Sequence, residues 1–537
     1  MEWSPSPLHA TKQAAALAPT VAAAKLCGEA PALPLLTVDQ EVDSLGFGRF
    51  QVIALLVLGL ANASDAVELL CLSFILPQLT LETGEALSSS AKAALSSAIF
   101  VGMLAGGLVF GLAADSLGRR TTLTFSLAVN GVFGLLAAAS PQFGALLACR
   151  VLAGFGVGGS IPGVFTLAAE LLPTPDRGFW LSTVAWWWMV GAVYTAGAAW
   201  VMLGVQRLSW QAFAAVCALP ALAAAALVLL LLPESPRFLH TRGSAQGALD
   251  ALLFMARANG RQSRLELGWR LVEPPAPSAG SSSSSSSGGS GSGSGSGSRG
   301  FLCLPQASIA PVRDFFSPGN RRVAALLCTV WFCLSLGWYG LIGWIPTLFK
   351  NVHLELDVYQ DSFLVAAAYL PGNIVSALLM ERIGRRGVLA SSLLLACMSA
   401  IAFPFAKTEA TVVLAACTLN AVSTCSCEWA GGPPAALPAR AQQTHAPTLT
   451  PPPKGNALDC LSVESFPTSL RTTSLGILAA TGRIGSIVGQ WVFGSLIDKS
   501  IVALLSVAAL FLGVGAIAAW LLPAEIKSKS LQETATS

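Results

Sequence analysis

The feature of this sequence that most restricts its fold is a series of long apolar runs, of about 18 residues or more each, between residues 50 and 522. A helix of about 20 apolar residues spans a bilayer, where it has to satisfy its own backbone hydrogen bonds. Only 11% of the 537 residues are charged, against about 25% in an average soluble domain. The sequence therefore predicts an all-α protein embedded in a lipid bilayer.

Twelve apolar runs can be placed along the chain. The expected spans are 50–76, 90–111, 121–139, 143–172, 180–203, 210–232, 323–345, 362–379, 388–406, one starting near 411, 473–496 and 502–522. Arginines lie in alternate links between them, and positively charged links stay on the cytosolic side of a membrane. We therefore expect a multi-pass protein of the plasma membrane or of an intracellular vesicle or vacuole, with both termini in the cytosol.

A short charged link, Gly111-Leu-Ala-Ala-Asp115-Ser-Leu-Gly118-Arg119-Arg120, joins the second and third runs. Its glycines permit a tight turn, and Asp115 can accept hydrogen bonds from the arginine pair or cap the next helix. A degenerate copy, Ala377-x-x-x-Glu381-x-x-Gly384-Arg385-Arg386, joins two runs of the second half. The chain therefore contains an internal repeat.

A second pair of landmarks supports the repeat, because Glu170-Leu-Leu-Pro-Thr-Pro-Asp-Arg177 closes span 4 and Glu464-Ser-Phe-Pro-Thr-Ser-Leu-Arg471 closes span 10. The second half carries extra residues at about 426–454, which are rich in Pro, Gln, Thr and His and interrupt span 10. Unbonded backbone cannot face lipid. We expect this insert to be either an extruded loop or a gene-model error.

The G-x-x-x-D-x-x-G-R-R pattern resembles the signature loop between the second and third helices of the major facilitator superfamily. The resemblance implies two pseudo-symmetric six-helix bundles around a central cavity, each made of inverted three-helix repeats. The expected domains are a cytosolic N-terminal tail at 1–48, a first bundle at 49–232, a cytosolic central loop at 233–320, a second bundle at 321–523 with the insert at about 426–454, and a cytosolic tail at 524–537. Within them we expect disorder over 1–41, short surface helices over 243–270 and a flexible Ser/Gly linker over 281–298.

Other stretches narrow the resemblance to the sugar-porter-related branch of that superfamily: Arg150-x-x-x-Gly154-x-Gly156-x-Gly158, Glu170 to Gly178, and Pro233-Glu-Ser-Pro-Arg237. Four more resemble synaptic-vesicle-two-related proteins and niacin-type permeases: Gly46-Phe-Gly-Arg-Phe-Gln51, Asp65-Ala-Val-Glu68, Tyr359-Gln-Asp361 and Pro371-Gly-Asn373. The resemblance implies a secondary transporter that works by alternating access. A transporter-like sensor or scaffold that signals through the central loop is the alternative.

Asp65 and Glu68 lie on one face of the first span, where ionisable groups are costly and usually functional. At ~1.5 Å per residue, Asp65 lies about 22 Å along its span from Phe50, which leaves it ~8 Å below the outer surface of a ~30 Å hydrocarbon core. Arg150 lies about 10 Å below the same surface along span 4, so the depths of the two residues match. In proton-coupled sugar porters an aspartate of the first span pairs with this arginine, and the resemblance implies the same pair here. Separating the two would favour protonation of Asp65. We expect Asp65, Arg150 and Glu68 to couple transport to protons, the alternative being a static ion pair.

Arg483 lies near the middle of span 11, where a cation would attract an anion. The position resembles the arginine of organic-anion carriers, and it favours a small organic anion such as an aromatic carboxylate as substrate. Alternatively, Arg483 pairs with Glu68 or Asp65 and never meets substrate. A sugar or an organic cation is the alternative substrate.

Three aromatic residues, Trp187, Trp338 and Tyr339, would offer flat walls to a ring-bearing substrate, although such side chains more often pack between helices. Glycines at small-xxx-small spacing, such as Gly102 with Gly106 and Gly154 with Gly158, predict close helix packing instead.

Charged residues of the cytosolic links are expected to gather at one face and hold the inner gate shut, because ion-pair networks excluded from water are stronger than isolated rim pairs. The candidate gating residues are Asp115, Gly118, Arg119, Arg120, Glu170, Arg177, Glu234, Arg237, Glu381, Arg385, Glu464 and Arg471. The alternative is that these arginines only set the topology.

The remaining composition argues against an enzyme. The chain has four histidines and 12 scattered cysteines, with no CxxC pair and no nucleophile motif in a polar context, so we expect no cofactor and no metal site. A net charge of +3 does not indicate nucleic-acid binding. The expected partners are a small-molecule substrate, protons and lipid, and the expected state is a monomer.

Overall fold

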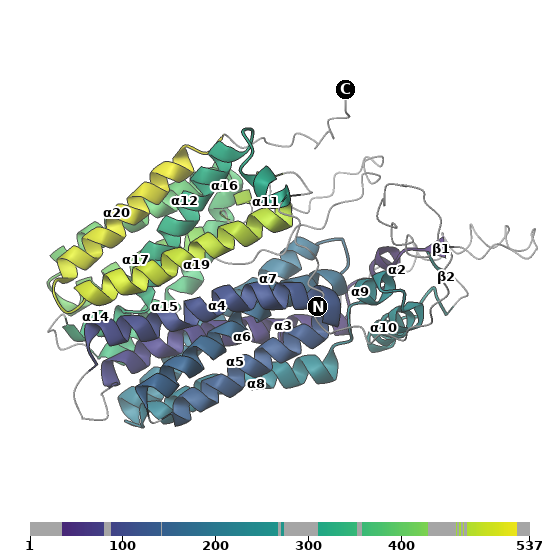
Figure 1. The fold of residues 1–537 in the computed structure, drawn as a ribbon, viewed down its shortest axis with the longest axis horizontal. Coiled ribbons are helices and arrows are strands. Elements are labelled where there is room, and N and C mark those ends of the chain that lie inside the picture. Colours follow the sequence, from purple (N-terminus) through teal and green to yellow (C-terminus); the bar gives the residue numbers. More distant parts are fainter. Residues whose placement is uncertain are drawn as a thin grey trace, which may run out of the picture.

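The computed structural model describes residues 35–79, 87–140, 142–266, 270–272, 310–351, 357–427, 458, 461–462, 465–466 and 470–523. Within them the chain is helical apart from one pair of two-residue strands. The helices form two bundles that lie side by side along their length (Figure 1). The insert at about 426–454 and the Ser/Gly linker fall almost entirely outside the described residues.

The first bundle contains six long helices. They are α3 (Arg49–Ile75), α4 (Ser89–Leu117), α5 (Arg119–Ala139), α6 (Phe143–Leu171), α7 (Arg177–Ala199) and α8 (Trp210–Leu231), with η1 (Leu76–Gln78) and η2 (Trp200–Val205) continuing α3 and α7. Serine hydroxyls fix two of the starts, since Ser88 and Ser209 each accept a hydrogen bond from the backbone of the first turn of α4 and α8. Such caps satisfy one of the free N–H groups at a helix start.

The second bundle follows the same order with more breaks. Its elements are α12 (Arg321–Leu334), η3 (Ser335–Tyr339), α13 (Gly340–Ile342), α14 (Ile345–Asn351), α15 (Val358–Ala367), α16 (Tyr369–Ala402), η4 (Phe403–Phe405), α17 (Glu409–Cys427), α19 (Arg471–Leu496) and α20 (Ile501–Trp520), preceded by α11 (Ala310–Phe315). The backbone of α16 turns at Gly384, where two expected spans meet.

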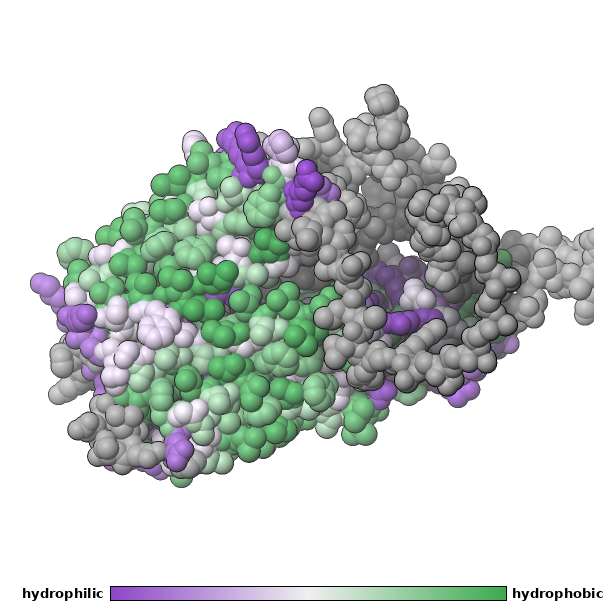
Figure 2. Space-filling view, in the orientation of Figure 1, coloured by the Kyte–Doolittle hydropathy of each residue, from purple (hydrophilic) through white to green (hydrophobic). Residues whose placement is uncertain are grey.

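Nine helical segments of the described chain are long and apolar enough to cross a membrane. Figure 2 shows apolar side chains spread over the flanks of both bundles and hydrophilic ones gathered towards the ends. An apolar flank of this kind is matched to lipid rather than to water. The protein is therefore a multi-pass membrane protein, and the expectation of twelve helices in two halves agrees with this architecture.

Close approach of α4 and α6 depends on the predicted small residues. A Cβ atom at Gly102 would lie 2.0 Å from the carbonyl oxygen of Val151, and one at Gly154 would lie 2.2 Å from that of Ile99. Both atoms belong to backbone, which cannot swing aside as a side chain can. The prediction that these glycines serve helix packing is confirmed.

The two copies of the charged turn have the same backbone geometry. Gly118 has φ 105° and Gly384 has φ 77°, values that glycine adopts without strain. The second arginine of each turn reaches the end of the last helix in its own bundle: Arg120 donates to the carbonyl oxygen of Leu229, and Arg386 to that of Trp520. The internal repeat seen in the sequence is therefore also a repeat of contacts.

A small folded unit covers one end of the first bundle, at the right in Figure 1. This cap consists of β1 (Leu35–Leu36), α2 (Val38–Leu45), α9 (Pro236–Thr241), α10 (Ala245–Ala258) and β2 (Arg270–Leu271), with β1 and β2 paired in parallel. The expectation of surface helices within 243–270 is confirmed by α10, whereas α9 begins earlier and was not predicted.

The expectation of a disordered N-terminal tail is wrong for the part of it that lies in the cap. Thr37 and Gln40 form a capping box that starts α2. The carboxylate of Glu41 is fully buried and accepts hydrogen bonds from the hydroxyl of Ser263 (2.6 Å) and the backbone N–H of Arg264 (3.1 Å). Capping and a satisfied buried carboxylate offset the entropy lost on ordering this segment.

Polar contacts between the two bundles gather at the end opposite the cap. Asp498, just after α19, accepts a hydrogen bond from Ser89 at 2.6 Å and lies 3.7 Å from the ammonium of Lys92. Lys350 donates to the carbonyl oxygen of Pro77 at 3.0 Å, and Gln78 donates to the hydroxyl of Tyr359. The bundles are thus fastened together at this end.

Candidate functional site

A buried ion pair lies inside the first bundle. Glu68 on α3 and Arg150 on α6 approach to 2.6 Å between Oε1 and Nη1, with side chains 3% and 1% exposed. Arg150 also donates to the sulfur of Cys71 at 3.8 Å. A pair so far from water is worth much less than its Coulomb energy, because both ions lose their hydration.

The implied pairing of Asp65 with Arg150 is wrong, since Arg150 bonds Glu68 instead. The two carboxylates are one helical turn apart, about 4.5 Å along the axis, and a depth estimate from sequence cannot separate them. Arg150 lies level with the carboxylate nearer the end opposite the cap.

Asp65 has polar partners of its own. The hydroxyl of Ser160 on α6 lies 2.8 Å and 2.7 Å from its two carboxylate oxygens, and the amide nitrogen of Asn130 on α5 lies 3.5 Å from Oδ1. All three side chains are fully buried or 1% exposed at most. The structure thus separates the two carboxylates of α3 into one held by an arginine and one held by neutral groups.

Three residues that contact the buried charges, Ser160, Asn130 and Cys71, were not predicted from the sequence. Serine and cysteine are common small residues in membrane helices, so neither stands out. Asn130 carried a clearer signal, because an amide in an apolar span needs buried partners.

Arg483 lies on the face of α19 that is turned towards the first bundle. A Cβ atom at Gly494 would lie 2.7 Å from that of Ala93 on α4, and Gly494 is about three full turns beyond Arg483, which puts both on one face. The positive charge of Arg483 acts on the carboxylate of Asp65. Whether Arg483 also meets substrate stays a prediction.

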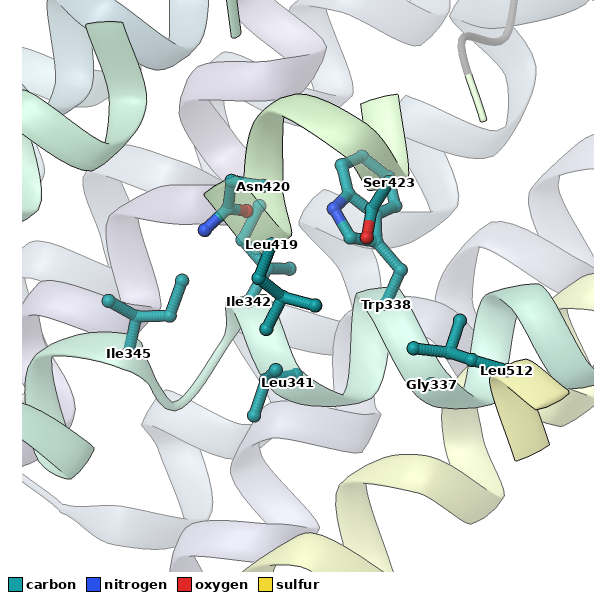
Figure 3. A pocket seen from close by; sticks show the side chains of 9 residues that line it. All are labelled: Gly337, Trp338, Leu341, Ile342, Ile345, Leu419, Asn420, Ser423 and Leu512. Carbon is teal, nitrogen blue, oxygen red and sulfur yellow. The ribbon is translucent and has the colours of Figure 1, made fainter. Parts of the chain in front are cut away.

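The aromatic candidates lie in different places. Trp338 lines a small pocket of the second bundle with residues of η3, α13, α14, α17 and α20 (Figure 3). Tyr339 packs edge-on against Trp338 at 4.6 Å and against Phe100 of α4 at 6.0 Å between ring centroids. Trp187 instead packs on the backbone of α3 at Gly59.

The pocket beside Trp338 is mostly apolar but contains two polar atoms. The indole Nε1 of Trp338 and the hydroxyl of Ser423 are buried and have no hydrogen-bond partner within the part of the chain that the structure describes. Buried polar atoms usually find partners. The hydrogen-bonding capacity of these two atoms is therefore unused within the described chain.

The interior of the second bundle is otherwise held by neutral hydrogen bonds. Gln490 on α19 accepts a hydrogen bond from the indole of Trp344 and donates to the carbonyl oxygen of Tyr339, both at 2.8 Å. Tyr369 donates to Asn420 at 3.2 Å. These bonds tie α16 to α17 and α19 to the broken helix of span 7.

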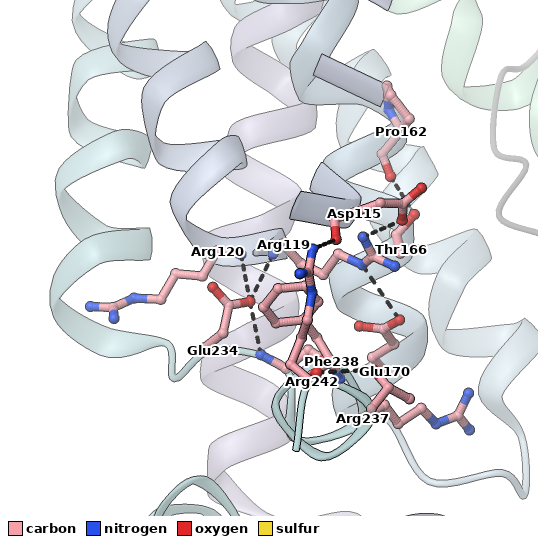
Figure 4. Close-up of polar contacts among 12 residues, drawn as sticks. Asp115, Arg119, Arg120, Pro162, Thr166, Glu170, Glu234, Arg237, Phe238 and Arg242 are labelled. Carbon is pink, nitrogen blue, oxygen red and sulfur yellow. Dashed lines mark hydrogen bonds and ion pairs between the residues drawn. The ribbon is translucent and has the colours of Figure 1, made fainter. Parts of the chain in front are cut away.

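Glu234, which follows α8, anchors the predicted gating cluster next to the cap (Figure 4). Its Oε1 accepts hydrogen bonds from the backbone N–H groups of Arg119 at 2.8 Å and Arg120 at 2.9 Å. A carboxylate at a helix N-terminus satisfies free donors and complements the helix dipole. Gly118 is needed here for its φ of 105°, and a Cβ atom on it would lie 2.4 Å from Glu234 Oε2 and push this carboxylate aside.

Arg119 joins the rest of the cluster. Its guanidinium lies 2.6 Å from Asp115 and 3.7 Å from Glu170. The ring of Phe238 lies 5.5 Å from the guanidinium carbons of both Arg119 and Arg242. Figure 4 shows these side chains converging from α4, α5, α6 and α9.

The other predicted gating residues are placed in part. Arg177 donates to the carbonyl oxygen of Leu172, and Arg237 pairs with Asp39 of the cap. Glu464 lies outside the described residues, as do the side chains of Glu381 and Arg471. The contacts described for the cluster stay within the first bundle and its cap, so they stiffen one half.

Asp361 is a further ionisable group, near the start of α15 at the end opposite the cap. It is 5% exposed, and its Oδ2 has no hydrogen-bond partner in the described chain. Burial, with Glu409 and Asp357 nearby, raises the pKa of this carboxyl from 3.8 to about 6. Desolvation and like charge both disfavour its ionised form.

Comparison with known proteins agrees with this architecture. The family model described as Major Facilitator Superfamily matches residues 53–446. The chain is 28% identical to synaptic vesicle glycoprotein 2A of Rattus norvegicus, over 87% of this chain and 76% of that protein. It is 27% identical to synaptic vesicle glycoprotein 2B of Mus musculus, over 89% of this chain and 84% of that protein.

Two solved structures share the fold. One is the partially occluded inward open conformation of the xylose transporter XylE from E. coli, with a TM-score of 0.63 and 16% identity over 90% of this chain and 100% of that one. The other is a crystal structure of a D-xylose-proton symporter, with a TM-score of 0.63 and 17% identity over 89% and 99% of the two chains.

Proposed function

The chain belongs to the Major Facilitator Superfamily, and from that premise we propose that this transporter is driven by protons and moves a small organic anion. The observation that carries the proposal is the fully buried Asp65, which is hydrogen-bonded by neutral partners and lies within the electrostatic influence of Arg483. A carboxyl group of this kind is costly inside a membrane and is best explained by proton exchange.

The proposed substrate is an aromatic or pyridine carboxylate. Arg483 supports it, because a guanidinium facing the other bundle near mid-membrane would attract an anion. Trp338 and Tyr339 support a ring-bearing solute, since flat rings stack on aromatic walls.

A sugar is the second candidate substrate. The unpartnered indole N–H of Trp338 and hydroxyl of Ser423 suit a neutral, hydroxyl-bearing solute. Two similar folds belong to proteins named as xylose carriers, although identity below 20% limits that likeness to the fold.

We place the cap and the gating cluster in the cytosol, with both termini, because arginine-rich links favour that side. The bundles are fastened at the opposite end by Asp498, Lys350 and Gln78. The proposed state of the carrier is therefore open towards the cytosol. The fasteners would have to part when the carrier opens to the other side.

Uptake by the purified protein in liposomes tests the proton step. With the outside of the liposomes more acidic than the inside, the native protein is expected to accumulate labelled nicotinate or benzoate inside them. Asp65→Asn should abolish gradient-driven accumulation and leave exchange intact. Asp250→Asn, which removes an exposed carboxylate of α10, serves as control. Accumulation that survives Asp65→Asn contradicts the assignment, and no uptake of any solute favours a sensor or scaffold.

Arg483→Ala tests the substrate. Loss of anion uptake with xylose uptake unchanged is expected if the guanidinium binds a carboxylate, with at least a tenfold fall in uptake rate at limiting substrate for a lost charged hydrogen bond of about 1.5–3 kcal/mol. Arg483→Lys keeps the charge and should recover part of that loss. Equal loss for both solutes would instead indicate a role in pairing with Asp65.

A further inference from the structure

Ser160 has one hydroxyl proton and three acceptors in reach. Its oxygen lies 2.7 Å and 2.8 Å from the carboxylate oxygens of Asp65, and 2.9 Å from the carbonyl oxygen of Val157 on its own helix. A hydroxyl is one donor and also an acceptor, and it rotates to suit its surroundings. The proton of Ser160 can therefore point at Asp65 or at Val157.

These two positions match the two protonation states of Asp65. When Asp65 is ionised, the Ser160 hydroxyl donates to the carboxylate. When Asp65 carries a proton, it donates that proton to the oxygen of Ser160, whose own hydrogen turns to the carbonyl oxygen of Val157. Neither state leaves a buried polar atom of this set unpaired, which would cost about 1–3 kcal/mol.

Asn130 offers a second adaptable partner. Its nitrogen lies 3.5 Å from Asp65 Oδ1, a long contact, while its own Oδ1 is buried with no partner in the described chain. The oxygen and nitrogen of an amide are exchanged by a half-turn of the side chain. After that turn, the oxygen of Asn130 can accept a proton from Asp65.

Among the residues that the structure describes, the side-chain hydrogen bonds given for Asp65 come from Ser160 and Asn130 and from no charged group. On α3, Glu68 is engaged by Arg150 of α6, and from the second bundle Arg483 acts on Asp65 through its charge. The groups in hydrogen-bond contact with Asp65 from the neighbouring helices are thus a hydroxyl and an amide, both of which can donate or accept.

We propose that Ser160 and Asn130 are positioning residues of a proton site, which hold Asp65 both with and without its proton. The inference rests on the proposed proton coupling through Asp65 and deepens it. Ser160 favours the ionised form, because a hydrogen bond to a charged acceptor is about twice as strong as a neutral one. Asn130 favours the protonated form, because its present contact with the ionised form is weak.

Infrared difference spectroscopy of the full-length protein between alkaline and acid pH tests this without a transport substrate. The carbonyl stretch of a protonated carboxyl should appear on acidification and vanish in Asp65→Asn, which assigns it to Asp65. In Ser160→Ala the midpoint of this titration should rise by about one pH unit, a tenfold change. In Asn130→Ala it should fall by a smaller amount.

Two further variants separate positioning from packing. Ser160→Thr keeps a hydroxyl and should return the midpoint towards the native value. Ser73→Ala removes a buried hydroxyl of α3 that, among the described residues, donates only to the carbonyl oxygen of Leu70 on its own helix, and it should leave the midpoint unchanged.

The outcomes distinguish the two proposals. An Asp65 band whose midpoint is the same in Ser160→Ala as in Ser73→Ala overturns the positioning role and leaves the proton site standing. A spectrum with no band that depends on Asp65 overturns both the positioning role and the proton site.

Discussion

The two bundles share a fold but differ in what their interiors hold. The first encloses Asp65 and the ion pair of Glu68 with Arg150. In the described part of the second, Gln490, Trp344 and the backbone of Tyr339 form neutral hydrogen bonds, and Arg483 adds a positive charge that acts on Asp65. The comparison teaches that a repeated fold does not require repeated chemistry: the first half buries two carboxylates and an arginine, while the second holds neutral hydrogen bonds, aromatic side chains and Arg483.

The charged turns show a similar contrast. Both copies use a glycine at positive φ and an arginine that reaches the last helix of its bundle. The first copy has in addition the carboxylate of Glu234 and the ring of Phe238 packed on it. The first turn is therefore built into a cluster that includes the cap.

The largest expected effect comes from breaking the charged interior of the first bundle. Glu68→Gln leaves the arginine buried without its counter-ion, and arginine cannot shed its proton. We expect a loss of about 3–5 kcal/mol of stability, measured by thermal unfolding in detergent. Arg150→Met should cost less, since Glu68 can take up a proton.

A double variant sharpens that result. Glu68→Leu with Arg150→Met replaces both charges by apolar groups, and it should recover most of the stability lost in Glu68→Gln. If the double variant is the least stable of the three, the attraction within the ion pair stabilises the fold by more than the desolvation of its two charges costs.

A smaller effect is expected from breaking the neutral interior of the second bundle. Gln490→Leu leaves the indole of Trp344 and the carbonyl oxygen of Tyr339 unpaired, which should cost about 1–3 kcal/mol in the same unfolding measurement. Because none of these groups titrates, the loss should be the same at acid and neutral pH. A loss of stability that grows with pH would mean that a titrating group takes part in these hydrogen bonds, which contradicts the prediction.

The last expected effect depends on pH and concerns Asp361, the buried acid at the rim of the second bundle. Its folded-state pKa of about 6 lies above its ordinary value of 3.8, so the folded protein binds the extra proton between these values. Stability should therefore fall as pH rises through this window. Asp361→Asn should flatten that fall, and unfolding midpoints of the two proteins at pH values across the window check it.

Much of the architecture could be predicted from the sequence, because apolar length and the repeated turn are strong signals. The N-terminal part of the cap, β1 and α2, was missed although the capping box of Thr37 and Gln40 was readable, since short amphipathic segments are hard to separate from disordered tails. The partner of Arg150 could not be chosen from the sequence, because Asp65 and Glu68 lie only about one turn apart along the same helix and a depth estimate does not separate them. Ser160 was invisible because its role depends on a contact between two helices.

The parallel pairing of β1 with β2 joins residues 35–36 to residues 270–271. The strands come just before the first long helix and soon after α10, so the first half begins and finishes at one place. The two ends of the first half are thus held together by this strand pair. A break in the chain after β2 would leave the pair, and with it the folded first half, intact.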